Sequence, residues 1–283
     1  MLAFDHALVL HPELAAGVRA AERLGFAPTP IGRHGQGMGT ANATIMMPDQ
    51  QTYLELLAVS EPTARNADKR AALAARGAHL FGAAFKGDAR EAAARFEAAG
   101  IAGGDAFDFA RPVASPTGPQ DARFAIAPIR SGALPGLSAF VCQHFTPELV
   151  WRPDRLDHPN GARAIIRLWG VADAPEALGA AWRAVVSDAV RSDRQSVDVA
   201  LGAARASYLT PTAWAERFGA RAPAPHAPGS QPPELRAIEV AAGPEPRLLD
   251  ALEAGAIAFD RVEGRLRVAD AFGLGAEVFF API

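Results

Sequence analysis

The sequence of 283 residues is poor in lysine and cysteine and has no long apolar run. Its one cysteine, Cys142, cannot form an internal disulfide, and the common zinc sites built from several cysteines are excluded. No segment approaches the roughly 18 consecutive apolar residues of a membrane-spanning helix, so we expect no membrane partner. Residues 1–6 lack the basic and apolar regions of a secretory signal, and we expect a cytoplasmic protein.

The basic residues are almost all arginine. Lys69 and Lys86 are the only lysines, so arginine accounts for 26 of the 28 basic residues. The arginines are scattered among acidic residues, the net charge is −3, and no basic stripe of the kind that binds nucleic acid is present. Together with the abundant alanine, this usage indicates GC-rich codons, and nucleic acid is not an expected partner.

Hydrophobic residues make up 49% and charged residues 21% of the chain, which is typical of a soluble globular protein with a substantial core. One pattern recurs four times: a short apolar run, a break, an amphipathic stretch rich in alanine and leucine, and then glycine or another small residue. The apolar runs predict strands and the amphipathic stretches predict helices. The predicted strands are 4–10, 79–85, 164–171 and 235–241, and the predicted helices are 12–24, 89–99, 175–186 and 246–253.

Further β-like sequence follows each predicted helix. Each repeat therefore indicates one strand, one helix and several strands over about 60 to 80 residues, a longer period than that of solenoid repeats. The sequence predicts an α+β fold of four βαβββ modules in two pairs, each pair around a shared cavity. An ordinary α+β chain whose segments are alike by chance is the alternative.

Two proline-rich stretches divide the repeats. Residues 147–161 separate the second repeat from the third, and residues 219–234, with five prolines, indicate an extended linker before the fourth. Residues 69–76 predict a short connecting helix after the first module. We expect one domain at 1–155 with the chemically recognisable cavity, and a second, degenerate pair of modules at 156–283.

His6 and Glu55 are polar residues inside otherwise apolar strands of the first repeat. An ionised carboxylate in such a strand is costly unless it is paired or bound to a metal. If the two strands are neighbours, facing side chains have Cβ atoms about 5 Å apart, close enough to share one metal ion or for Glu55 to orient His6. The alternatives are a His–Glu pair with a purely structural role and a Glu55 that points to solvent.

The segment 32–42 is rich in glycine and carries Arg33, His34, Thr40 and Asn42 as donors and acceptors. Glycine allows tight turns and a close approach of the backbone to a ligand. The segment lacks the strand-to-helix context of a phosphate-binding loop, so nucleotide binding is not indicated. We expect these four side chains to contact a small-molecule substrate, with an ordinary glycine-rich hairpin as the alternative.

Cys142 and His144 lie two residues apart in a strand-like segment, on one face and about 6.6 Å from each other. Neighbours along one strand are badly aimed for proton transfer, and a lone cysteine in an apolar strand usually belongs to a core. We therefore expect no cysteine nucleophile and interpret His144 as a cavity residue. His79 is either a ligand or structural, while His226 falls in the proline-rich linker.

Two sets of motifs point to a known family. One comprises Phe-Asp-His-Ala-Leu-Val at 4–9, Leu-Gly-Phe at 24–26, the glycine-rich segment and Tyr-Leu-Glu-Leu-Leu-Ala-Val at 53–59; the other comprises Gln-His-Phe-Thr-Pro-Glu-Leu-Val-Trp-Arg at 143–152 and His-Pro-Asn-Gly at 158–161. Together they resemble the glyoxalase-like domain branch of the vicinal oxygen chelate superfamily. The resemblance is strongest over residues 1–60, is weaker to 161, and beyond that consists of the repeat pattern alone. It implies paired βαβββ modules.

The resemblance also implies that metal ligands come from the first and last strands of two modules. His6 matches the first-strand ligand and Glu55 the last-strand ligand of the first module. In the second module the first-strand position falls at Phe81, and the last-strand position falls at Gln143 or His144. The implied site holds a divalent Zn, Ni, Mn or Fe ion between His6, Glu55 and His144, with Gln143 as the alternative ligand or as a substrate contact.

The function implied by the resemblance is that of a metal-dependent enzyme that chelates adjacent oxygens of a small-molecule substrate. His6 and Glu55 would be its catalytic residues, and a lyase, an isomerase and a dioxygenase are all compatible with this interpretation. A metal-free protein of the same fold that binds a drug-like or aromatic molecule is the alternative, favoured by the missing ligand in the second module. A third hypothesis is a structural role as a homodimer.

Overall fold

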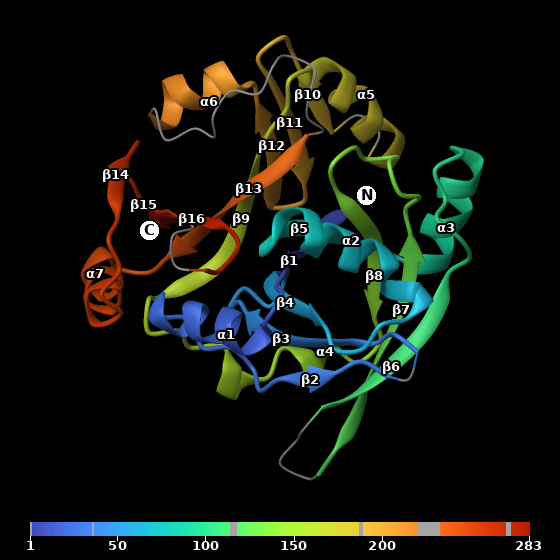
Figure 1. Ribbon diagram of the computed structural model, residues 1–283, viewed down its shortest axis with the longest axis horizontal. Helices are drawn as coiled ribbons and strands as arrows, with labels where there is room; N and C mark the ends of the chain where they lie inside the picture. Colours follow the sequence, from blue (N-terminus) through green and yellow to red (C-terminus); the bar gives the residue numbers. More distant parts are fainter. Residues whose placement is uncertain (1, 36, 114–117, 187–188, 220–232, 270–272) are drawn as a thin grey trace.

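The chain forms two eight-stranded mixed sheets, one coloured blue to green and the other olive to red in Figure 1. This computed structural model describes residues 2–35, 37–113, 118–186, 189–219, 233–269 and 273–283. The first sheet contains β1 (Ala3–Leu10), β2 (Gly32–Arg33), β3 (Thr40–Met46), β4 (Tyr53–Val59), β5 (His79–Lys86), β6 (Phe107–Val113), β7 (Gln120–Pro128) and β8 (Ser138–His144). The second contains β9 (Ala162–Val171), β10 (Val190–Ser192), β11 (Ser196–Leu201), β12 (Ala204–Leu209), β13 (Glu234–Ala242), β14 (Asp260–Val262), β15 (Arg265–Val268) and β16 (Glu277–Pro282).

Helices connect and cover these strands. The α-helices are α1 (Leu14–Arg23), α2 (Ala67–Arg76), α3 (Ala89–Ala98), α4 (Pro147–Val150), α5 (Pro175–Val186), α6 (Pro211–Phe218) and α7 (Glu245–Ala254). Two 3-10 turns, η1 (Ala64–Asn66) and η2 (Pro153–Arg155), precede α2 and follow α4.

Each sheet is built from two modules with the order strand, helix and three strands. The strand orders are β2-β3-β4-β1-β5-β8-β7-β6 and β10-β11-β12-β9-β13-β16-β15-β14. The first strand of each module pairs parallel with the last strand of its own module and antiparallel with the first strand of the partner module. The predicted α+β fold of four βαβββ modules in two pairs is confirmed, while the domain boundary at residue 155 stays a prediction.

Local sequence determines where the helices begin and end. Asp88 caps α3, since its Oδ1 accepts hydrogen bonds of 3.0 and 2.8 Å from backbone N–H groups of the first turn. Pro175 begins α5, where its missing N–H costs nothing. Gly25 follows α1 with φ +78°, and a Cβ there would lie 2.9 Å from side-chain atoms of Ala251 and Asn160. This turn therefore requires glycine.

The two sheets share one hydrophobic core. One cluster of buried apolar residues includes one face of each sheet and residues of α1, α3, α5 and α7. Strands β5 and β13 contact each other within it, and Phe85 of β5 packs edge-on against Trp182 of α5, with ring centroids 5.8 Å apart. The opposite face of each sheet is consequently turned away from the shared core.

These opposite faces carry separate apolar clusters. On the first sheet Tyr53 and Phe124 pack with Trp151, which follows α4, and on the second sheet Trp169 packs with Trp214 of α6. The edge strands β2 and β6 contact each other although they stand at opposite ends of the strand order, so the first sheet curls and this face is concave. We call this face the first cup, and the corresponding face of the second sheet the second cup.

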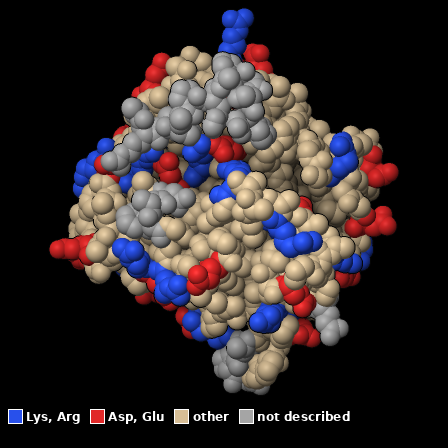
Figure 2. Space-filling model, in the orientation of Figure 1, with Lys and Arg blue, Asp and Glu red and all other residues tan. Residues whose placement is uncertain are grey.

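Some elements differ from the sequence prediction. Strand β6 and helices α4 and α6 were not predicted, whereas the connecting helix expected at 69–76 is present as α2. Most of the linker expected at 219–234 lies outside the described residues, and so does His226. No helix within the described ranges is both long enough and apolar enough to cross a membrane. On the face shown in Figure 2, basic and acidic residues are interspersed, with no broad area of one charge.

Candidate functional site

A cluster of buried polar side chains occupies the first cup. It combines residues from β1, β3, β4 and β8 with one residue that directly follows β2. We call it the polar cluster; its members are Asp5, His6, His34, Thr40, Asn42, Glu55 and His144. The exposed fraction of its carboxylate and imidazole side chains runs from 0% for Asp5 to 11% for His34. Since such groups are rarely buried without partners, their mutual contacts define the site.

A β-bulge places two consecutive residues, Asp5 and His6, in the polar cluster. The pairing of β1 with β5 shifts by one residue between Phe4 and His6, so Asp5 is the extra residue of the bulge. Side chains of consecutive strand residues normally point to opposite faces, and a bulge changes this alternation locally. The carboxylate of Asp5 can therefore reach the imidazole of its own neighbour.

His6 lies between two carboxylates. Its Nδ1 is 2.6 Å from Asp5 Oδ2, and its Nε2 is 3.4 Å from Glu55 Oε2. Its ring stacks on Tyr53, which is the residue opposite His6 in the parallel β1–β4 register, with centroids 4.2 Å apart. The structure thus brings His6 and Glu55 together, while their roles as catalytic residues and metal ligands stay predictions.

Glu55 has further polar neighbours on the side of the glycine-rich segment. Asn42 Nδ2 donates a 2.7 Å hydrogen bond to Glu55 Oε1, and His34 Nε2 lies 3.7 Å from the same oxygen. The other ring nitrogen of His34, Nδ1, is 2.7 Å from Thr40 Oγ1. Of the four predicted substrate-binding residues of this segment, His34 and Asn42 contact Glu55, and Thr40 contacts His34.

The charges of this cluster stabilise one another. Burial raises the pKa of the Asp5 carboxyl, but hydrogen bonds to His144 and His6 outweigh it and lower that pKa to about 2. For Glu55 the hydrogen bond and charge of His6 likewise outweigh burial and lower the pKa to about 2. Burial lowers the pKa of His6, yet its hydrogen bonds to Asp5 and Glu55 raise it to about 9. At neutral pH His6 is an imidazolium between two carboxylates.

His34 differs from His6 in its protonation. Burial lowers the pKa of His34, and the positive charge of Arg111 lowers it further, while the charge of Glu55 acts in the opposite direction. His34 is therefore neutral at pH 7, and it is tied to Thr40 through Nδ1. The site contains one charged and one neutral imidazole on either side of Glu55.

The segment that carries His34 is anchored through Gly39. The Asn66 amide donates hydrogen bonds of 3.1 Å to the carbonyl of Gly39 and 2.9 Å to that of Glu61. Gly39 has φ +62°, and a Cβ there would collide with Glu61 O and lie 2.7 Å from Asn66 Nδ2. This close packing fixes the start of β3, from which Thr40 and Asn42 project into the polar cluster.

His144 lies on the far side of Asp5 from Glu55. Its Nε2 is 3.0 Å from Asp5 Oδ2 and 3.6 Å from Cys142 Sγ. Single ligand atoms of Asp5, Cys142 and His144 all lie within 4.8 Å of one another, a spacing that could hold a metal ion. Burial raises the pKa of the Cys142 thiol well above its usual value. The predicted trio of His6, Glu55 and His144 is thus linked through Asp5, which sequence reasoning did not include.

Two predicted substrate contacts lie elsewhere. Gln143 alternates with Cys142 and His144 along β8, and its Oε1 accepts a 3.0 Å hydrogen bond from the N–H of Ala89 at the start of α3. It caps a helix on the other face of the sheet. Arg33 is exposed and directly precedes His34. The roles expected for Gln143 and Arg33 in binding substrate or metal stay predictions.

The remaining histidines of the first two modules have structural contacts. His79 Nδ1 is 2.8 Å from the carbonyl of Gly77, and its ring contacts Phe81 edge-on with centroids 5.9 Å apart. His158 accepts a hydrogen bond from Ala27 N–H at Nδ1, and its Nε2 is 2.9 Å from the carbonyl of Met46. The motif at 158–161 therefore fastens the chain between the two sheets to the first module.

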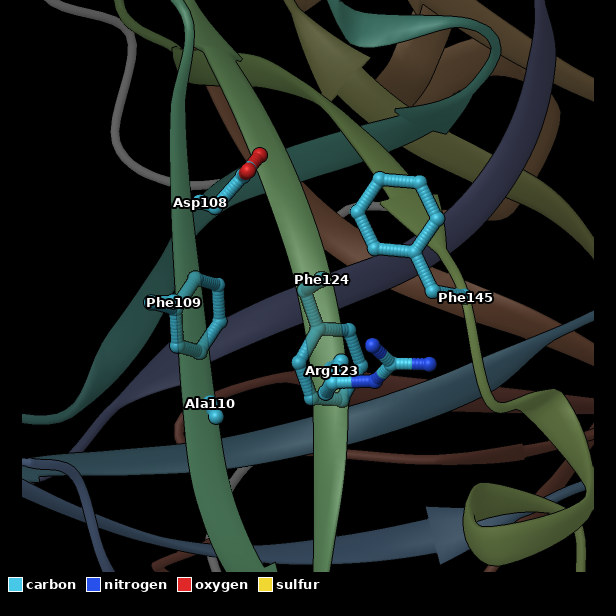
Figure 3. A pocket seen from close by; sticks show the side chains of 6 residues that line it. All are labelled: Asp108, Phe109, Ala110, Arg123, Phe124 and Phe145. Carbon is cyan, nitrogen blue, oxygen red and sulfur yellow. The ribbon is translucent and has the colours of Figure 1, made fainter.

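A pocket of about 450 Å³ borders this cluster, since its lining residues Phe109 and Phe124 contact His34 and His144. It is lined by Asp108, Phe109, Ala110, Arg123, Phe124 and Phe145. In Figure 3 Phe109 and Phe124 lie on adjacent strands, and Asp108 points away from their rings. Asp108 pairs with Arg90 of α3, a helix that packs on the face opposite the first cup. The pocket contains no member of the polar cluster, so we place the chemistry at the polar cluster.

The sequence matches a known family model. The model described as "Glyoxalase-like domain" matches residues 4–186, which is more than half of the chain. A search of curated proteins gives no match. The matched segment contains every member of the polar cluster.

Several solved structures share the fold over the whole chain. A hypothetical protein from Staphylococcus aureus has a TM-score of 0.65 at 10% identity, with 100% of both chains covered. A mutant of 4-hydroxymandelate synthase from Streptomyces coelicolor has a TM-score of 0.61 at 12% identity, covering 100% of this chain and 92% of that one. A Mn(II)-bound glyoxalase from Novosphingobium aromaticivorans has a TM-score of 0.53 at 13% identity, covering 100% and 83%. At these identities the likeness establishes the fold alone.

Proposed function

Because the chain belongs to the glyoxalase-like domain family, as its motifs indicated, we propose that it is a metal-dependent enzyme acting on a small molecule with adjacent oxygens. The contact between His6 Nε2 and Glu55 Oε2 carries this proposal. Both residues are buried in the first cup, on neighbouring strands, where an unpaired charge would be costly. Similarity to a glyoxalase with bound Mn(II) supports the choice of a divalent ion.

The donor set around His6 fits a metal. Two atoms that each bind one ion at about 2.1 Å lie about 3.0 to 3.4 Å from each other, and the His6 Nε2 to Glu55 Oε2 distance is 3.4 Å. Histidines that bind metals usually donate their second ring N–H to a carboxylate, and Asp5 stands behind His6 in this way at 2.6 Å. We propose His6 and Glu55 as ligands, with the remaining positions of the ion open to the substrate oxygens.

The group of Asp5, Cys142 and His144 is a weaker metal site. Asp5 Oδ2 already contacts two imidazoles, so an ion there would compete with both of them. Burial keeps the Cys142 thiol protonated, whereas a metal ligand must be the thiolate. These observations favour a metal ion between His6 and Glu55 over one between Asp5, Cys142 and His144.

The side chains around Glu55 have separate tasks in this proposal. A divalent metal, when bound, would polarise adjacent oxygens of the substrate and stabilise negative charge on them. Asn42 holds Glu55 in place through Oε1. His34, neutral and fixed by Thr40 at Nδ1, is positioned to accept or return a substrate proton at Nε2.

Metal content of purified variants tests the proposal. Wild type, His6→Ala, Glu55→Gln and Cys142→Ala are incubated with Mn, Fe, Ni or Zn, desalted and analysed for bound metal, and circular dichroism checks folding. We expect metal in wild type and Cys142→Ala and its loss in the other two variants. Loss in Cys142→Ala alone would move the ion to the Asp5 side, and no metal in wild type would refute metal dependence.

A metal-free binding protein of the same fold is the second candidate. Its support is that two carboxylates already neutralise His6 without an ion. In a thermal-shift screen, stabilisation by aromatic or drug-like compounds but by none of the four metals would favour this function. A small-molecule partner and a homodimer both remain predictions.

A further inference from the structure

Arg111 of β6 is an arginine on the inner face of the first cup. Burial along β6 alternates, with Phe109, Arg111 and Val113 half-buried and the residues between them exposed. The Arg111 guanidinium carbon lies 5.9 Å from the ring centroid of Phe124, which belongs to the apolar cluster of the first cup. Its Nη1 is 3.9 Å from the position that a Cβ on Gly32 would take. Arg111 thus reaches from β6 towards the opposite edge strand.

The guanidinium of Arg111 has no carboxylate to balance it. Within the described ranges of the chain, Arg111 makes no ion pair or hydrogen bond through its guanidinium. Its cation–π contact is with the ring of Phe124. A half-buried guanidinium ordinarily finds a carboxylate, because its five donors lose water on burial. An arginine with vacant donors at the mouth of a cup is suited to bind an anion.

The carboxylates of the first cup already have other partners. Asp5 lies 2.6 Å from His6 Nδ1 and 3.7 Å from Lys86 Nζ, and Glu55 lies 3.4 Å from His6 Nε2. Among the described residues neither carboxylate forms an ion pair with Arg111. An anionic ligand would supply the missing partner.

The surroundings of Arg111 indicate the shape of that ligand. The rings of Phe109 and Phe124 stack at 4.9 Å and form an apolar wall beneath the guanidinium. Gly32 has only Asn42 Oδ1, at 3.5 Å, and Arg111 Nη1 within 4 Å of its missing Cβ, so the opposite side is uncrowded. The planar fork of arginine matches a carboxylate with two parallel hydrogen bonds.

We propose that Arg111 binds the carboxylate of a small aromatic or apolar acid, whose remaining part lies against Phe109 and Phe124. This inference rests on the proposed function, because it places the bound acid beside His34 and Glu55 of the proposed active site. It also narrows that function to anionic substrates. Phe109 contacts His34, with ring centroids 6.5 Å apart, which places the apolar wall next to the polar cluster.

Benzoate and benzamide, which have the same shape but differ in charge, test the proposal. Calorimetric or thermal-shift titrations use the full-length protein after treatment with a chelator, so that the result does not depend on a metal. We expect benzoate to bind at least tenfold more tightly than benzamide. Arg111→Met should lose at least tenfold in benzoate affinity while its benzamide affinity stays the same, and Arg111→Lys should lie in between.

Arg19→Met is the control, since Arg19 is an exposed arginine of α1, a helix that packs on the face opposite the first cup. It should bind both compounds as wild type does. Equal affinity of wild type for the two compounds, or wild-type benzoate affinity in Arg111→Met, would overturn the proposal. Metal content and benzoate selectivity of the wild type separate the two hypotheses. If the wild type binds metal but does not distinguish benzoate from benzamide, the carboxylate site alone is rejected. If it prefers benzoate but binds no metal, metal dependence alone is rejected.

Discussion

The two cups have the same fold and different chemistry. Strand β1 ends at Leu10 and β9 at Val171, each four residues before the first residue of the next helix, so Arg167 of β9 takes the place of His6. Glu55 stands opposite Leu8 in the β1–β4 register, and the corresponding position in the β9–β12 register is Ser207. The second cup therefore has an arginine and a serine where the first has a histidine and a glutamate.

The corresponding residues also touch in the same way. Arg167 Nη1 donates a 2.8 Å hydrogen bond to Ser207 Oγ, as His6 Nε2 approaches Glu55 in the first cup. An arginine has no lone pair for a metal, and a neutral serine hydroxyl is a weak ligand. The fold thus brings these two positions together in both halves, and the residue types decide whether the pair can carry chemistry.

The second cup is also closed by its own side chains. Trp214 and Phe218 of α6 pack onto Trp169, whose Nε1 donates a 2.8 Å hydrogen bond to Glu239. Four of its arginines have acidic partners, in the pairs Arg205–Asp198, Arg217–Glu263, Arg265–Glu239 and Arg267–Glu277. Among the described residues Arg111 of the first cup has no such partner. The comparison therefore favours the first cup as the place for the ligand binding proposed above.

Removal of the acidic or hydroxyl partner in each cup gives the largest expected difference. Glu55→Ala leaves His6 buried with half of its counter-charge, so we expect it to lower the free energy of unfolding by about 3 kcal/mol. Ser207→Ala removes one hydrogen-bonding hydroxyl from Arg167, which retains Asp198, and should cost about 1 kcal/mol. Urea denaturation of the metal-free protein measures both. Equal losses would contradict the distinction between the cups.

The pH dependence of stability should come from the first cup. The pKa of His6 rises from 6.5 to about 9 on folding, so its contribution is complete below pH 6.5 and is lost as the pH rises through 9. The pKa values of Asp5 and Glu55 fall to about 2, so their contribution is present above their unfolded values of 3.8 and 4.5 and is lost as the pH falls towards 2. We expect a decline of about 3 kcal/mol on the alkaline side.

Denaturation of metal-free protein between pH 6 and 10 measures this decline. His6→Gln should flatten the alkaline side, because it removes the titrating imidazole. Arg167→Gln, at the corresponding position of the second cup, should leave the slope of the wild type unchanged. A steep alkaline decline that persists in His6→Gln would assign the titration to another group.

The fold could be predicted because its signals are local. Each module is indicated by an apolar strand followed by an amphipathic helix, and in the first two modules a glycine with positive φ, Gly25 or Gly100, follows the helix. Strand β6 begins with the alternation Phe107, Asp108, Phe109, a signal that was overlooked, and Pro112 interrupts the pattern. Helix α6 was overlooked in the same way, although Thr210 caps it ahead of Pro211.

The site could be predicted only in part. The register of paired strands, and the face of the sheet to which each side chain points, depend on contacts between residues far apart in the sequence. His6 and Glu55 stand out as polar residues in apolar strands. Asp5 belongs to the polar cluster because of a bulge in the pairing of β1 with β5, and no local pattern in the β1 sequence predicts that bulge. Arg111 becomes significant only when the curled sheet brings β6 next to β2.

Gln143→Ala should have the smallest effect of the substitutions considered. It tests whether the ligand site is confined to the first-cup face of the sheet. Gln143 accepts a hydrogen bond from Ala89 N–H at the start of α3, and its loss should lower the free energy of unfolding by about 0.5 kcal/mol. Metal content and benzoate affinity should stay at the wild-type level, because its side chain lies on the opposite face from His144. Asn42→Ala is the matched comparison, since it removes a side-chain amide that contacts Glu55 directly and should weaken metal binding. If Gln143→Ala weakened metal or benzoate binding as much as Asn42→Ala, the ligand site would extend through the sheet to α3, and the two faces could not be treated as separate.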